Sequence, residues 1–113
     1  MINRNFICII GGAGHVGLPL GLALRSKSYD VTLIDKNQKN IKKINNGIMP
    51  FVEDCCGKLL KKMIYKKKIF ATNQLDKVKK CKYIIVCIGT PINNRFKPDL
   101  KKFFNFFSFF KSL

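Results

Sequence analysis

The sequence contains one histidine, no tryptophan and only six acidic residues, against 22 lysines and arginines. The single histidine, His15, cannot form a histidine-based zinc site, and none of the five cysteines belongs to a C-x-x-C pair. We therefore predict no metal site. No uninterrupted apolar run approaches the ~20 residues of a membrane-spanning helix, so we also expect no membrane partner.

The excess of basic residues gives a formal net charge of +16. A charge of this size is typical of proteins that bind nucleic acids. Here, however, the lysines are spread along the whole chain, and most of the ten phenylalanines lie in apolar runs instead of alternating with lysines as on base-stacking surfaces. A basic nucleic-acid-binding domain is therefore the less favoured alternative.

Two of the five cysteines, Cys8 and Cys87, lie inside apolar runs that are typical of strands, so we predict that they are small core residues. An odd number of cysteines in such positions favours a reducing compartment. The apolar run after Arg4 is too short for a signal peptide. Together these features predict a cytoplasmic protein.

The most informative stretch is 6–17, where five apolar residues lead into a glycine-rich turn and then into a helix-like apolar run. Gly12, Gly14 and Gly17 fit the pattern G-x-G-x-x-G, which in this context predicts a dinucleotide site. Gly12 would permit the tight turn, and Gly14 would allow a pyrophosphate to approach the backbone. Gly17 would allow the helix to pack closely on the strand. The alternative is a glycine-rich strand–helix turn with no ligand.

An acidic residue follows the next apolar run. Asp35 ends the run 31–35 and lies 18 residues after Gly17, close to the spacing of about 20 expected for the acid that binds the adenosine ribose. A carboxylate there would repel a 2′-phosphate, so we predict NAD rather than NADP as the cofactor. The alternative is an incidental exposed aspartate.

Strand-like apolar runs alternate with helix-like segments along the chain. We expect strands at 5–10, 30–35, 69–72 and 83–88, and helices at 14–27, 38–46, 54–65, 74–80 and 100–113. This alternation predicts one α/β domain: a Rossmann-like parallel sheet with helices on both faces, truncated at about four strands in the order 3-2-1-4. The continuous apolar run 83–88 predicts a strand that is buried on both faces.

Several motifs together resemble a known family. The stretch Gly12–Leu20 resembles the N-terminal signature of the UDP-glucose/GDP-mannose (nucleotide-sugar) dehydrogenases, and the resemblance extends from residue 5 to about residue 105. Further family motifs follow in order at Asn46-Gly47 with Pro50–Glu53, at Ala71-Thr72, at Ile88–Pro91 and at Pro98–Leu100. The resemblance implies NAD as the cofactor and oxidation of the C6 alcohol of a nucleotide sugar to a carboxylate in two NAD-dependent steps.

The resemblance also implies roles for individual residues. It assigns Asp35 to the adenosine ribose and Thr90 to the nicotinamide half, while the pyrophosphate falls to Gly12, Ala13, Gly14, His15, Val16 and Gly17. His15 stands where many members have tyrosine, which implies packing or cofactor contact. Glu53 is either a site residue or the cap of the next helix. Asn40, flanked by Lys36 and Lys39, stands where the family often has a basic residue near the adenosine.

The family's catalytic cysteine, its lysine and its sugar-binding domain have no counterpart in residues 1–113, so we assign no catalytic residue. We expect an NAD-binding domain that is incomplete at its C-terminus and inactive alone: a fragment, a truncated product or half of a split enzyme. The nucleotide sugar would bind only in the complete enzyme. The six phenylalanines of Phe103–Phe110 and the edge of the fourth strand predict self-association or a partner fragment. A non-catalytic dinucleotide-binding module is the alternative function.

Overall fold

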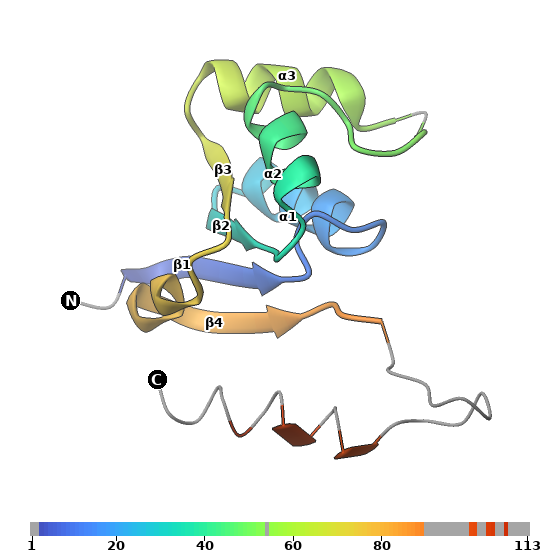
Figure 1. The fold of residues 1–113 in the computed structure, drawn as a ribbon. Helices are drawn as coiled ribbons and strands as arrows, with labels where there is room; N and C mark the ends of the chain where they lie inside the picture. The colour runs from blue at the N-terminus through green and yellow to red at the C-terminus, as the bar shows by residue number, and fades with distance from the viewer. Residues whose placement is uncertain (1–2, 54, 90–99, 102–103, 106–107, 109–113) are drawn as a thin grey trace.

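The computed structural model describes residues 3–53, 55–89, 100–101, 104–105 and 108. Their main feature is a parallel sheet with the strand order β3-β2-β1-β4 (Figure 1). The elements are β1 (Asn3–Ile10), α1 (Gly17–Ser26), β2 (Asp30–Ile34), α2 (Gln38–Asn45), α3 (Gly57–Tyr65), β3 (Ile69–Thr72), the 3-10 helix η1 (Leu75–Lys80) and β4 (Cys81–Val86). The predicted fold class and strand order are confirmed.

The helices α1, α2 and α3 cover one face of the sheet (Figure 1). Alternate side chains of a strand point to the same face, so every second strand residue contributes to this core. The buried strand residues are Ile7, Ile9, Val31, Leu33, Ile69 and Ala71, and the helices add Leu18, Leu22, Ile41, Ile44, Leu60 and Met63. This apolar cluster fixes the start of α1 against the end of β1.

The opposite face carries a smaller cluster under η1. Cys8, Ile10 and Ile34 point from the strands toward Val78 of η1. Cys8 is fully buried, as predicted, and a disulfide joins it to Cys81 at the start of β4. Sequence reasoning did not predict this pairing, because the two cysteines are 73 residues apart and only the parallel pairing of β1 with β4 brings them together.

Two helices begin later than the sequence predicts. Helix α1 begins at Gly17 instead of residue 14, because residues 11–16 form turns. Helix α3 begins at Gly57 instead of residue 54, and residues 55 and 56 form a bend. Helix α2 begins where expected, since the Asn37 side chain accepts a hydrogen bond from the Asn40 backbone N–H at 3.1 Å.

The outer edge of β3 is closed by an amide side chain. Asn45, the last residue of α2, donates from Nδ2 to the Ala71 carbonyl and accepts at Oδ1 from the Ala71 N–H, both at 2.9 Å. The side chain thereby makes the two hydrogen bonds that a neighbouring strand would make at this position. The Ala71 N–H and carbonyl groups are therefore not available for pairing with a further strand.

Strand β4 lies at the other edge, and the prediction that it is buried on both faces is wrong. Tyr83 is 51% exposed, and Ile84 and Val86 are 37% and 36% exposed. Cys81 at its start is buried under η1. An unbroken apolar run predicts a buried strand only where both faces are covered, and η1 covers only the beginning of β4.

The predicted last helix is partly described: residues 100, 101, 104, 105 and 108 are helical, and Phe104 is 61% exposed. The rest of the phenylalanine-rich segment and Thr90 lie outside the described residues. Among the described helices, none combines the length and the apolar character that crossing a membrane requires.

Candidate functional site

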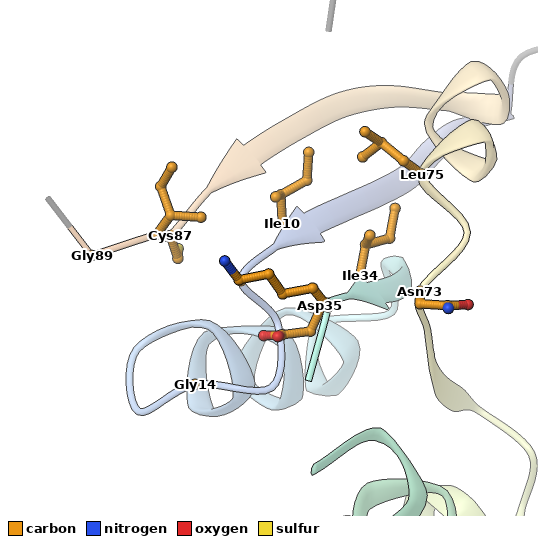
Figure 2. Close-up of a pocket in the computed structure, with 11 residues that line it drawn as sticks. Ile10, Gly14, Ile34, Asp35, Asn73, Leu75, Cys87 and Gly89 are labelled. Atoms are coloured by element: carbon orange, nitrogen blue, oxygen red, sulfur yellow. The ribbon is translucent and has the colours of Figure 1, made fainter. Parts of the chain in front are cut away.

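A cavity of about 800 Å³ opens at the carboxyl ends of β1, β2 and β4 (Figure 2). Ligands of open parallel sheets bind at this end of the strands, where neighbouring connections diverge. The lining residues are Ile10, Gly11, Gly14, Ile34, Asp35, Lys36, Asn73, Leu75, Cys87, Ile88 and Gly89. Of the predicted site residues, Gly14 and Asp35 line the cavity. The other predicted residues of the loop are not among those that line it: Gly12, Ala13, His15, Val16 and Gly17.

The tight turn after β1 is made by Gly11. Its φ is +81°, in the left-handed region that favours glycine, and a Cβ there would overlap the Cys87 carbonyl. The N–H groups of Gly11 and Gly12 both donate to the Ile34 carbonyl, at 2.8 and 3.1 Å. The sequence analysis assigned the turn to Gly12, and the structure corrects this assignment.

Most glycines of the loop are required by packing inside the protein. A Cβ on Gly12 would lie 2.8 Å from Leu33 Cβ, and one on Gly17 would overlap the Gly11 carbonyl. The close contact between helix and strand, predicted at Gly17, lies at Gly21, where a Cβ would come 2.7 Å from Leu33 Cδ2. These positions exclude larger residues whether or not a ligand binds.

Gly14 differs from the other glycines of the motif. A Cβ on Gly14 would meet only the Gly11 carbonyl oxygen, at 3.4 Å, and Gly14 lines the cavity. Contacts among the described residues therefore leave room for a small side chain at this position. A glycine here instead leaves open space at the cavity wall, which is what close approach of a ligand to the backbone requires.

Asp35 joins the end of β2 to the glycine loop (Figure 2). Its Oδ2 accepts a hydrogen bond from the Ala13 N–H at 3.0 Å, and its Oδ1 accepts one from the Asn37 N–H at 3.0 Å. A carboxylate has about four lone-pair sites, so each oxygen retains capacity for a further donor. Asp35 is partly exposed at the cavity and can accept hydrogen bonds from a diol.

The backbone donors of the loop divide into two groups. The N–H groups of residues 11–14 are used inside the protein, with Gly14 donating to the Gly11 carbonyl at 3.2 Å. Within the described part of the chain, the N–H groups of His15, Val16 and Gly17 have no acceptor. Three consecutive donors at the start of α1, together with the positive end of the helix dipole, favour an anion such as a phosphate.

His15 lies in the loop and stacks on Phe51. The ring centroids are 4.0 Å apart, and the ring planes make an angle of 21°. This contact confirms that His15 packs, and it ties the glycine loop to the connection between α2 and α3. An aromatic ring at position 15 is needed for this stack.

Glu53 caps α3, the second of the two roles considered for it. Its Oε2 accepts hydrogen bonds from the backbone N–H groups of Cys56 and Cys55. The Cys56 hydrogen bond lowers the pKa of the Glu53 carboxyl below its ordinary value of 4.5, and the Cys55 bond acts in the same direction. Burial raises the pKa of the Cys56 thiol, and the neighbouring Glu53 adds to the effect. Glu53 is not among the residues that line the cavity.

Apart from Gly14 and Asp35, the residues that line the cavity were not among the predicted site residues; they include Asn73 and Leu75, which follow β3. The rule that sites gather at the carboxyl ends of parallel strands applies to β3 as well and could have found them. Among the described residues, no group of three or more histidines, cysteines or acids could hold a metal ion.

A glycine loop between β1 and α1, an acid at the end of β2 and a cavity at the strand ends define a Rossmann-like dinucleotide-binding domain. The profile of the UDP-glucose/GDP-mannose dehydrogenase family, NAD binding domain, matches residues 5–109. The chain belongs to this family and corresponds to its NAD binding domain.

Individual relatives agree with this assignment. The chain is 36% identical over 94 residues to UDP-N-acetyl-D-glucosamine 6-dehydrogenase of Salmonella typhi, covering 83% of this chain and 21% of that protein. It is 33% identical over 89 residues to UDP-N-acetyl-D-mannosamine dehydrogenase of Pyrococcus horikoshii, covering 79% and 21%. The crystal structure of GDP-mannose dehydrogenase from Pseudomonas aeruginosa superposes with a TM-score of 0.78 at 28% identity, covering 86% of this chain and 22% of that one. The chain thus spans about a fifth of the length of these relatives.

Proposed function

We propose that this domain binds NAD in the cavity at the strand ends. The observation that carries the proposal is the run of three backbone N–H groups at the start of α1 that have no acceptor among the described residues, next to the open space at Gly14. In this arrangement the loop receives the diphosphate through Gly12, Ala13, Gly14, His15, Val16 and Gly17. Donors fixed by the backbone bind an anion without first having to be ordered.

Asp35 holds the adenosine ribose and selects NAD over NADP. Its carboxylate oxygens are held toward the loop by Ala13 and Asn37 and can each accept a ribose hydroxyl. A 2′-phosphate at the same place would bring two anions together, which is unfavourable. Thr90, four residues beyond the end of β4, is proposed for the nicotinamide half by the family resemblance.

The chemistry of the complete enzyme is proposed to be oxidation of the C6 alcohol of a nucleotide sugar to the carboxylate, for which bound NAD accepts the hydride. Residues 1–113 contribute cofactor binding and orientation to this reaction, and none of them is proposed as a catalytic residue. We infer that this part of the enzyme works in the cytoplasm and acts with a partner fragment or a second copy. It should produce no NADH from nucleotide sugars alone.

The test is calorimetric titration of the full 113-residue chain with NAD and with NADP. We expect binding of NAD and at least tenfold weaker binding of NADP, as a repelled phosphate implies. UDP-glucose alone serves as the control ligand and should not bind. Tighter binding of NADP than of NAD would refute the role proposed for Asp35. If the chain binds neither dinucleotide, the proposed function is refuted.

A further inference from the structure

Two charged side chains line the described part of the cavity, the acidic Asp35 and the basic Lys36. Lys36 follows Asp35 directly and lines the same cavity as Gly11 and Gly14. Among the described residues that line this cavity, it is the only basic one. The neighbouring lysines of α2, Lys39 and Lys42, are exposed and do not line it.

The charge of Lys36 is not neutralised by the carboxylate beside it. The two hydrogen bonds that Asp35 accepts within the described part of the chain come from backbone N–H groups. The ion pair found there is Arg25–Asp30, at 3.3 Å, where β2 begins. Lys36 therefore keeps an ammonium group at the cavity that has no acidic partner among the described residues.

A dinucleotide places two negative charges between its two nucleosides, and the Asp35 carboxylate adds a third to the same cavity. The open N–H groups of the loop offer partial charges only. A compact ammonium on a flexible stem suits a phosphate as a point-charge partner. On the basis of the proposed function, we propose that Lys36 supplies the positive charge that pairs with the diphosphate of the bound dinucleotide.

This role makes a prediction that depends on charge. An exposed ammonium–phosphate pair is screened by salt, so its contribution must fall as ionic strength rises. Packing of the lysine stem against the adenosine would not depend on salt. The diphosphate and a 2′-phosphate are distinguished by comparing NAD with NADP, because only NADP carries the second group.

The experiment measures the affinities of NAD, NADP, ADP and adenosine for the full chain and for Lys36→Met, at about 50 mM and about 500 mM salt. Lys39→Met removes the same charge from an exposed position outside the cavity and is the matched control. We expect Lys36→Met to weaken the binding of NAD and ADP about two- to fivefold at the lower salt concentration and much less at the higher one. Adenosine binding and the Lys39→Met variant should stay unchanged.

The outcomes separate this inference from the function on which it rests. Equal NAD affinity of Lys36→Met and Lys39→Met refutes the role of Lys36 and leaves NAD binding intact. A loss confined to NADP assigns Lys36 to a 2′-phosphate instead, and an equal loss for adenosine assigns it to packing; either result overturns the proposal. Failure of the unmodified chain to bind NAD refutes both. Thermal melts of the two variants, which should match, show that the fold is retained.

Discussion

Asp35 and Ala13 are 22 residues apart in the sequence, yet the Asp35 Oδ2 accepts a hydrogen bond from the Ala13 N–H at 3.0 Å. The bond joins the end of β2 to the middle of the glycine loop. The same carboxylate that is proposed to bind the ribose therefore also fixes the loop that is proposed to bind the diphosphate. Two parts of one ligand would be recognised by groups that already hold each other in place.

Replacing Asp35 with asparagine should lower the affinity for NAD and weaken the discrimination against NADP. Loss of charged hydrogen bonds costs about 1.5–3 kcal/mol, which corresponds to about a ten- to hundredfold change in affinity. Titration with both cofactors measures the ratio. Asp76→Asn, an exposed change of equal charge on η1, is the control. An unchanged ratio in Asp35→Asn would contradict the assignment.

Two glycines of the motif should respond differently to substitution. Gly14→Val should abolish NAD binding with little loss of stability, since a Cβ there meets only one carbonyl oxygen, at 3.4 Å. Gly17→Ala should instead destabilise the fold, by about 1–3 kcal/mol, because its Cβ would overlap the Gly11 carbonyl. Thermal melts and NAD titrations distinguish the two effects. Equal losses of stability would show that Gly14 is also a packing glycine.

Removing the Asn45 side chain should destabilise the sheet at β3. Asn45→Ala leaves the Ala71 N–H and carbonyl without their partner, at a cost of about 1–3 kcal/mol and several degrees in Tm. Asn46→Ala is the matched control, because the Asn46 side chain donates to the Lys42 carbonyl of the helix that it follows and makes no hydrogen bond to β3 among the described residues. Similar melting temperatures for the two variants would rule out the closure of the β3 edge as a source of stability.

The cap of α3 should make stability depend on pH in the acid range. The folded-state pKa of Glu53 lies below 4.5, so the stabilisation by the ionised carboxylate is present above about pH 4.5 and is lost as the pH falls through the lower folded-state pKa. The difference in Tm between the unmodified chain and Glu53→Gln should therefore disappear in this acid range. A difference that stays constant down to pH 2 would exclude the charge as its cause.

The exposed side chains of β4 should cause self-association. Ile84→Lys places a charge on this edge and should shift the chain toward monomer in sedimentation velocity, since charged edge strands resist pairing. Phe70→Lys removes a side chain of β3 that is also exposed, at 45%, and should not change association. A monomeric unmodified chain that binds no hydrophobic dye would contradict the prediction.

Most of the fold could be predicted because local patterns and the global arrangement agree. The runs that form β2 and β3 are bounded by turn residues, and Asn37 begins α2 as a side-chain cap. The glycine spacing and Asp35 likewise pointed to two residues that line the cavity, Gly14 and Asp35, since both signals depend on short-range spacing at the ends of two adjacent strands.

The remaining features depend on contacts between distant segments. The turn lies at Gly11 because the Cys87 backbone passes against it, and no motif spacing reveals that neighbour. The exposure of β4 reflects its place at the sheet edge, whereas its sequence alone is that of a central strand. The stack of His15 on Phe51 likewise joins residues that only the fold brings together.

The contact at Gly11 has a mechanical consequence. The Cys87 carbonyl lies where a side chain at Gly11 would be, and the Cys87 N–H donates to the Ile10 carbonyl at 2.7 Å. The backbone at Cys87, just after β4, thus packs directly on the backbone of the glycine loop, with no side chain between them. The end of β4 and the glycine loop therefore touch through backbone atoms alone, so neither can shift at this contact unless the other moves with it.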